Sequence, residues 1–262
     1  MALTAQLPYG VHTTWRTRQD DQAHEYHASL TGFKKIDILL GQFVGEDTMQ
    51  TKRLLLTDLG NVLVSFRDRL EHLRDIVAKL GGNPEIISRI FRQQLAAGLK
   101  GEDMYALIDE GAMSFADLHT RIIAGSGLDL SPERLAALYA RHLEPIVPVV
   151  ELFNKARAPV VAVSNGDWGS RHAVDMLTVY HGMRFLETFV SCERHCRKPQ
   201  LFSLVIKWLE GKGYRPEDCL FVDDVPAYCE AAECLGIRSL CFNATREPIQ
   251  RLWDEFQRFG VI

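Results

Sequence analysis

Residues 53–66 read RLLLTDLGNVLVSF, an apolar run that ends at Asp58 and is followed two positions later by Gly60. The run is short, aliphatic and not alternating, which is typical of a strand buried on both faces of a parallel sheet. Open parallel sheets bind their ligands beyond the carboxyl ends of the strands. The segment therefore predicts a buried strand that ends in a candidate functional carboxylate, although a turn-forming aspartate would look the same when taken alone.

The rest of the sheet is predicted from runs of the same character. They lie at residues 158–164, 219–223 and 237–242, with a weaker candidate at 187–191. Helical patterns separate the later strands, with Pro199 and Pro226 near helix starts and Gly236 as a helix stop. Strands and helices that alternate at this spacing predict an α/β fold, an open parallel sheet with right-handed crossovers.

The interval 66–148 shows helix signals and no convincing strand. One helical face is predicted to carry the apolar residues Phe66, Leu70, Leu73, Val77 and Leu80. Further helix starts are predicted at Asn83, at Ser114 with Asp117, and at Ser131. These signals predict a helical cap at 66–148, inserted between core segments 49–65 and 149–262.

Residues 1–48 fit neither pattern, and we treat them as an N-terminal extension of uncertain status. Met49 stands just before the first predicted strand, so it is a candidate start of the chain. The alternative is an arm of short strands, for which 25–33 and 34–43 are candidates.

Composition limits the classes of partner. The chain has 262 residues, 47% of them hydrophobic and 24% charged, and a net charge of −4. This balance does not indicate a nucleic-acid or membrane partner, and no apolar run reaches the roughly 20 residues that span a bilayer. The six cysteines lie between Cys192 and Cys241, which favours a reducing, cytoplasmic setting. Cys192, His195 and Cys196 are interpreted as ordinary side chains near a strand rather than a metal site. Oligomeric state is left open.

Polar groups follow several of the predicted strands. Asp58 ends the first, Ser164 and Asn165 end the second, and Asp223 and Asp224 end a later one. Lys198 stands in a loop just before a helix. Three carboxylates close together repel one another unless a cation is present, and oxygen ligands of this kind suit Mg²⁺. Mg²⁺ beside a lysine and a serine hydroxyl is an arrangement that binds a phosphate. Each of these polar residues alone is a weak signal, but together they predict a phosphate site.

These segments resemble the motifs of the haloacid-dehalogenase-like (HAD) hydrolase superfamily. LLLTDLGNVLV resembles its first motif, VVAVSN its second, CRKP the lysine motif, and CLFVDDVPAYCEAAECLGI its fourth, over residues from about 53 to 242. The resemblance implies a Rossmann-like core with an α-helical cap inserted after the first motif. It also implies a phosphatase that uses Mg²⁺ and acts on a small phosphorylated substrate.

The resemblance assigns roles to individual residues. Asp58 is the nucleophile that forms an aspartyl-phosphate, and Lys198 pairs with the phosphate and orients Asp58. Ser164 and Asn165 hold phosphoryl oxygens. The residues assigned to Mg²⁺ are Asp58, Gly60 through its backbone carbonyl, Asp223 and Asp224.

Gly60 departs from the family pattern. Most phosphatases of the superfamily carry an aspartate at this position as general acid, a function commonly worth about 10²–10⁴ in rate. The DLGNV, RKP and DD segments resemble a branch of sugar-1-phosphate phosphatases, which favours hydrolysis. The alternatives are a catalytically weakened HAD-like binding protein and a metal-independent dehalogenase, for which the pair Asp223–Asp224 would have no evident function.

The missing acid also predicts the kind of substrate. Without a proton donor, the leaving oxygen must tolerate negative charge, so anomeric, aryl and acyl phosphates should react better than simple alkyl phosphates. Cap residues that could supply a proton instead are Glu102, Asp103 and His119. Trp168 follows the second motif closely and is expected either to line the pocket or to pack against the sheet.

Overall fold

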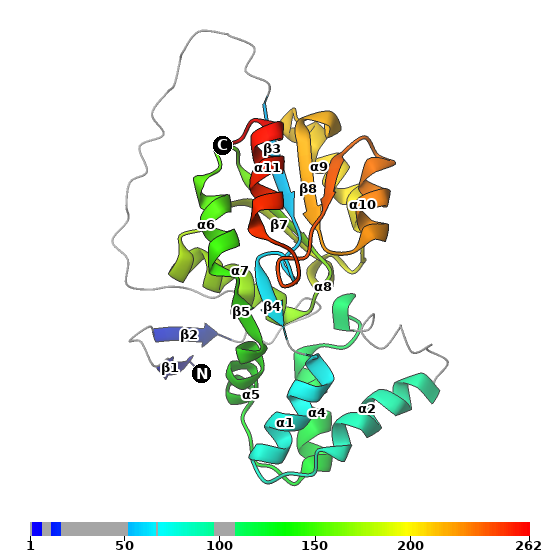
Figure 1. Cartoon of the computed structure of the whole chain (residues 1–262). Helices are drawn as coiled ribbons and strands as arrows, with labels where there is room; N and C mark the ends of the chain where they lie inside the picture. Colours follow the sequence, from blue (N-terminus) through cyan, green and yellow to red (C-terminus); the bar gives the residue numbers. More distant parts are fainter. Residues whose placement is uncertain (1, 7–11, 17–51, 67, 97–107) are drawn as a thin grey trace. The chain divides into compact units, whose positions relative to one another are not determined.

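The computed structural model describes residues 2–6, 12–16, 52–66, 68–96 and 108–262 (Figure 1). The chain divides into two compact units, Met1–Met49 and Gln50–Ile262, each described here by itself. In the first unit, β1 (Ala2–Gln6) and β2 (His12–Arg16) pair antiparallel. The strands predicted at 25–33 and 34–43 lie outside the described residues.

The second unit contains a five-stranded parallel sheet in the order β7-β6-β3-β8-β9. Its strands are β3 (Leu54–Thr57), β6 (Val160–Ser164), β7 (Phe185–Val190), β8 (Cys219–Asp223) and β9 (Arg238–Cys241). Every residue of β3, β6 and β8 is buried, because these strands lie in the middle of the sheet. The predicted α/β fold with an open parallel sheet is confirmed.

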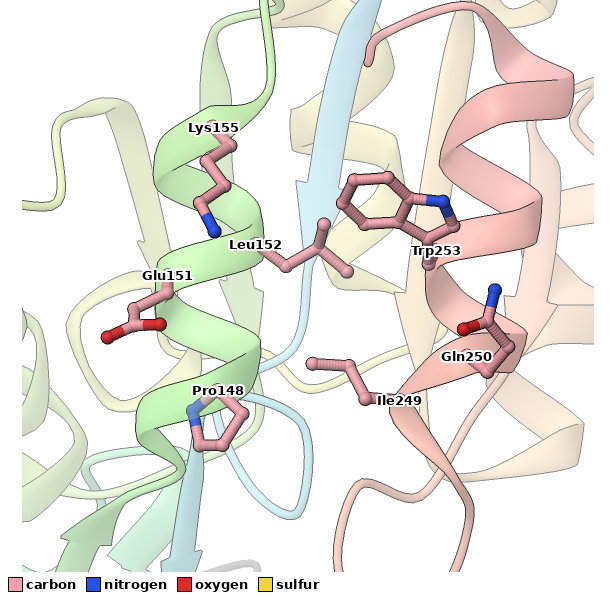
Figure 2. Close-up of a pocket in the computed structure, with 7 residues that line it drawn as sticks. All are labelled: Pro148, Glu151, Leu152, Lys155, Ile249, Gln250 and Trp253. Atoms are coloured by element: carbon pink, nitrogen blue, oxygen red, sulfur yellow. The ribbon is translucent and has the colours of Figure 1, made fainter.

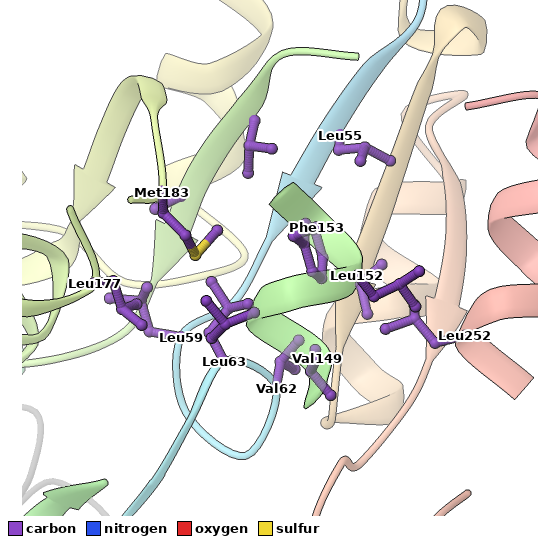
Figure 3. Close-up of a cluster of buried hydrophobic side chains, with 14 of the residues drawn as sticks. Leu55, Leu59, Val62, Leu63, Val149, Leu152, Phe153, Leu177, Met183 and Leu252 are labelled. Carbon is purple, nitrogen blue, oxygen red and sulfur yellow. The ribbon is translucent and has the colours of Figure 1, made fainter. Parts of the chain in front are cut away.

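Helices cover both faces of this sheet. One face packs against α6 (Val147–Lys155), α7 (Trp168–His181) and α11 (Ile249–Phe259), as the buried side chains in Figure 3 show. The other face packs against α9 (Leu201–Lys212) and α10 (Pro226–Glu233). Within β3, Leu55 joins the first cluster while Leu54 and Leu56 join the second. Both faces are thus apolar, which explains why the strand sequences do not alternate.

Four cap helices, joined by apolar side chains, form a group to which β4 and β5 lead (Figure 1). They are α1 (Arg69–Lys79), α2 (Glu85–Ala96), α4 (Phe115–Ser126) and α5 (Pro132–Tyr139). Ser114 and Asp117 form the predicted capping box of α4, and Ser131 caps α5. Buried Val77, Ile122 and Leu135 lie in the cluster that joins these helices. No helix in the described ranges is long and apolar enough to cross a membrane.

Two short strands correct the sequence prediction. β4 (Val64–Phe66) pairs antiparallel with β5 (Leu143–Pro145), so the interval predicted to lack strands contains one. Phe66 belongs to β4 rather than to the apolar face of α1, because Asp68 caps that helix and it begins at Arg69. The pattern missed this ribbon because three residues are too few to show a period of two, and the partner strand is far away in sequence. The cap boundaries at 66 and 148 stay a prediction.

The remaining short elements connect the larger ones. They are α8 (Ser191–Arg194), η1 (Ala140–His142) and η2 (Pro216–Asp218).

Candidate functional site

The carboxyl ends of β3, β6 and β8 bring their polar residues to one edge of the sheet. These three strands are neighbours, so Asp58, Ser164 and Asp223 follow in adjacent positions. The backbone N–H of Asp58 donates to the carbonyl of Val222 at 2.8 Å and continues the pairing with β8. The sheet topology thus places side chains far apart in sequence at a common edge, which we call the rim.

Lys198 lies between two of these carboxylates. Its Nζ is 3.1 Å from Oδ1 of Asp58 and donates to Oδ2 of Asp223 at 2.5 Å. All three side chains are nearly inaccessible to solvent. Burial alone would lower the pKa of Lys198, but the charges of Asp58 and Asp223 outweigh it and raise that pKa. Lys198 is therefore a fixed ammonium group at the rim.

Asp58, Asp223 and Asp224 present oxygen atoms that lie within 4.8 Å of one another. Burial raises the pKa of Asp223 to about 7, with the charge of Asp58 acting in the same direction and Lys198 opposing it. Oδ1 of Asp58 is buried and has the Lys198 ammonium as its ionic partner. Three carboxylates beside one ammonium leave excess negative charge, and an all-oxygen donor set of this size fits a hard divalent cation such as Mg²⁺.

Neighbouring groups orient the carboxylates. The backbone N–H of Val225 donates to Oδ1 of Asp223 at 2.8 Å. Asn61 and Asn243 donate side-chain N–H groups to Oδ2 of Asp224, at 2.9 and 3.2 Å. Asn61 has a φ of 53°, a left-handed conformation that asparagine tolerates better than most residues. The sequence analysis did not predict either asparagine as part of the site, although Asn61 lies within the DLGN segment of the first motif.

Ser164 and Asn165, the polar residues of the second motif, make different contacts. Ser164 is buried at the end of β6, and its Oγ donates to the carbonyl of Asn165 at 3.3 Å. The side chain of Asn165 is engaged at both ends: its Oδ1 accepts from the backbone N–H of Lys198 at 2.7 Å, and its Nδ2 donates to the hydroxyl of Tyr228 at 2.9 Å. The ring of Tyr228 lies 4.9 Å from the Lys198 ammonium. Asn165 and Tyr228 therefore position Lys198, and sequence reasoning missed Tyr228.

The ring of Phe66 fills the space beside Gly60. A Cβ added to Gly60 would lie 2.8 Å from Cε1 of Phe66 and 3.8 Å from Oδ2 of Asp58. The first distance is shorter than any ordinary carbon contact. A side chain at position 60 would therefore require the ring of Phe66, which is 45% exposed, to shift.

A buried polar cluster joins the cap to the core near this rim. Nη1 of Arg69 lies 2.6 Å from Oδ1 of Asp109 and 3.5 Å from Oδ2 of Asp167. The hydroxyl of Tyr139 donates to the same oxygen of Asp167, and Nη2 of Arg197 lies 3.8 Å from Oδ2 of Asp109. Asp109 and Asp167 are both buried. Because Asp167 follows the second motif and Arg197 precedes the lysine, the cluster couples cap helices to two segments of the rim.

Trp168 packs against the cap rather than the sheet. Its ring lies 3.9 Å from that of Phe115 and 4.3 Å from that of Tyr139, measured between centroids. Neither alternative in the sequence prediction described this contact, because the cap folds back onto the start of α7. Trp168 therefore contributes to the junction of cap and core.

The proposed proton donors of the cap divide into two groups. Nε2 of His119 lies 2.7 Å from the carbonyl oxygen of Leu130, a contact within the cap. Glu102 and Asp103 lie outside the described residues.

The cysteine-rich segment contributes no metal-binding group in the part of the chain that the structure describes. There, the groups of metal-ligating side chains comprise Asp58, Asp223 and Asp224 alone. Nδ1 of His195 lies 3.0 Å from the carbonyl oxygen of Glu110.

The surface pocket in Figure 2 is a separate feature. It has a volume of about 230 Å³, and Leu152 of α6 and Trp253 of α11 are among its lining residues. No residue of the rim lines it. The candidate site is therefore the rim and not this pocket.

Among known proteins, solved structures resemble this chain, but family models and curated sequences do not match it. No protein-family model matches the sequence, and a search of curated proteins gave no significant match. A HAD family enzyme from Bacteroides thetaiotaomicron is 22% identical, with a TM-score of 0.54 over 76% of this chain and 98% of that chain. The wild-type form of that enzyme, in complex with magnesium and inorganic phosphate, is 21% identical, with a TM-score of 0.53 over 77% and 98%.

A further match extends the likeness to a second organism. A predicted HAD-like family hydrolase from Porphyromonas gingivalis is 20% identical, with a TM-score of 0.54 over 79% of this chain and 98% of that chain. Each of these structures is covered over 98% of its own length. The chain has the fold of the haloacid-dehalogenase-like hydrolases.

Proposed function

We propose that this protein is a Mg²⁺-dependent phosphatase that hydrolyses a small, sugar phosphate-like metabolite through an aspartyl-phosphate intermediate. The observation that carries the proposal is the placement of the Lys198 ammonium between the buried carboxylates of Asp58 and Asp223. A structural ion pair would need one acid, whereas this rim holds three carboxylates around one lysine. The surplus charge suits a divalent cation and a phosphoryl group together.

The chain's own residues have distinct roles in this proposal. Asp58 attacks phosphorus and is phosphorylated, while Lys198 holds Asp58 in place and neutralises a phosphoryl oxygen. The hydroxyl of Ser164 donates to another phosphoryl oxygen. Because the side chain of Asn165 already holds Lys198 and Tyr228, we assign its contact with the phosphate to its backbone N–H.

The metal is assigned to Asp58, Asp223, Asp224 and the backbone carbonyl of Gly60. Mg²⁺ bound there would neutralise phosphoryl charge and so allow a carboxylate to approach phosphorus. The similar enzyme from Bacteroides thetaiotaomicron, solved with magnesium and inorganic phosphate, supports this choice of cation and ligand. The rim supports it independently, because Asp58, Asp223 and Asp224 present oxygen atoms within 4.8 Å of one another.

Gly60 limits the chemistry of the leaving group. No side chain at this position can donate a proton to the departing oxygen, so we expect anomeric, aryl or acyl phosphates to react faster than alkyl phosphates such as glycerol phosphate. A second candidate, a phosphate-binding protein with weak turnover, is favoured by the Phe66 ring that occupies the place of a donor. A dehalogenase would leave the carboxylate pair of Asp223 and Asp224 without a function.

We propose a small-molecule partner and a cytoplasmic setting. A net charge of −4 does not favour nucleic acid or anionic membranes as partners. All six cysteines are free thiols, which suits a reducing compartment.

The test is phosphate release from p-nitrophenyl phosphate, a panel of sugar phosphates and glycerol phosphate, with Mg²⁺ and with EDTA. We expect activity that needs Mg²⁺ and is lost in Asp58→Asn. Asp129→Asn is the matched control, because Asp129 is an exposed aspartate of the cap. Equal phosphate release by wild type and Asp58→Asn would refute the nucleophile. Binding of inorganic phosphate without turnover would favour the second candidate.

A further inference from the structure

The ring of Phe66 stands beside the carboxylate that is proposed to attack phosphorus. One point, the place of a Cβ on Gly60, lies 2.8 Å from Cε1 of Phe66 and 3.8 Å from Oδ2 of Asp58. The ring edge and the carboxylate therefore border the same small volume. Phosphorus must come within about 3–3.5 Å of the attacking oxygen, and the leaving oxygen lies in line beyond phosphorus, so a ring that borders this volume can contact the leaving group from the side.

The exposure of Phe66 is unusual for its surroundings. The neighbouring residues of the first motif, from Leu59 to Val64, include apolar side chains that are almost fully buried. Phe66 is 45% exposed although it is a large apolar residue next to a charged centre. Its backbone is held by pairing of β4 with β5, where it lies opposite Leu143. The ring is thus presented to solvent from a fixed backbone, beside the rim.

We propose that Phe66 is a specificity-determining residue on which the leaving group of the substrate packs. This rests on the proposed phosphate site at Asp58. A flat apolar ring that is partly exposed best complements a cyclic leaving group, either an aryl group or the apolar face of a sugar ring. An alkyl chain or a single small group would cover less of it.

The same geometry links Phe66 to Gly60. A Cβ at position 60 would displace the ring, so glycine lets Phe66 keep its present place. The position that lacks a proton donor thereby gains an apolar surface. Selectivity for the leaving group then comes from contact with a ring.

The test uses two non-hydrolysable probes that share one head group, phenylphosphonate and methylphosphonate. Each is titrated by calorimetry into the full chain with saturating Mg²⁺. We expect wild type to prefer phenylphosphonate by about tenfold, the size of a good aromatic contact. Phe66→Ala should reduce this preference to less than about twofold, and Phe66→Tyr should retain it. Tyr180→Ala is the matched control, since it removes an exposed ring near the far end of α7.

The outcomes separate this inference from the proposed enzyme. An equal preference in wild type and Phe66→Ala, or no preference in wild type, would overturn the role of Phe66. Failure of both phosphonates to bind would overturn the phosphate site together with the inference. Phenylphosphonate binding that depends on Phe66, in a protein that hydrolyses no phosphate ester, would support the inference and reject the phosphatase. Circular dichroism of each variant checks that the fold is retained.

Discussion

Replacing Lys198 by methionine should strongly destabilise the protein. The substitution keeps an unbranched side chain of similar length but removes the ammonium that lies 3.1 Å from Asp58 and 2.5 Å from Asp223. The lysine side chain is 1% exposed and that of Asp223 is 0% exposed, so water cannot replace the lost charge. Breaking a buried ion pair by removing one partner costs about 3–5 kcal/mol.

The expected shift can be measured by urea unfolding near neutral pH without divalent cations. With a slope of about 2–3 kcal/mol/M, the upper part of the usual range in urea, the midpoint should fall by about 1–2.5 M. Saturating Mg²⁺ should reduce the difference in urea midpoint between Lys198→Met and wild type. A bound cation neutralises the carboxylates that have lost their lysine partner. The two measurements together test both the pair and the metal site.

Lys79→Met provides the matched control. The side chain of Lys79 is 76% exposed and lies 3.9 Å from Asp75, an exposed ion pair of the kind worth about 0–1 kcal/mol. Its midpoint should hardly move. If Lys198→Met unfolds at the same urea concentration as Lys79→Met, the buried ion pairs of Lys198 do not stabilise the fold by the expected amount of about 3–5 kcal/mol.

Three further predictions concern the cap junction and position 60. Tyr139→Phe removes a hydrogen bond to the buried carboxylate of Asp167 and should lower the free energy of unfolding by about 1.5–3 kcal/mol, so an unchanged urea midpoint would contradict it. Burial lowers the pKa of His142 in the folded state. The imidazole therefore binds a proton at higher pH in the unfolded state than in the folded state, and the free energy of unfolding should fall as pH drops below about 6.5. His142→Gln should flatten that part of the plot of Tm against pH, and an identical slope would refute the assignment. Gly60→Ala adds no charge and should cost about 1 kcal/mol because its Cβ meets the half-exposed ring of Phe66, and this cost should vanish in a Phe66→Ala background, as a double-mutant cycle in urea can show.

The charged and polar groups of the rim could be predicted from the sequence because each signal lies within one short stretch of the chain. An apolar run predicts a strand, and a polar residue just after the run lies at the strand's carboxyl end. Once the strands are taken as parallel neighbours, Asp58, Ser164 and Asp223 must share an edge. The structure brings these residues together with Lys198, whose loop could be placed from the helix that follows it.

Other features could not be derived in this way, because they depend on contacts between distant segments. The spacing of Phe66 in the sequence was compatible with the apolar face of α1. Its pairing with Leu143, which is distant in sequence, places it in β4 instead. The hydrogen bonds from Asn165 to the loop of Lys198 and to Tyr228 join three separate segments.

By itself, the sequence determined the strands of the core, the caps of α4 and α5 and the identity of the acidic groups at the rim, since hydrophobic periodicity and helix capping act between near neighbours. Only the tertiary structure decided what surrounds those groups: which side chain fills the space beside Gly60 and which residues tie the cap to the core. The physical reason is that shape complementarity and buried charge pairing depend on three-dimensional distance, which residue spacing does not encode.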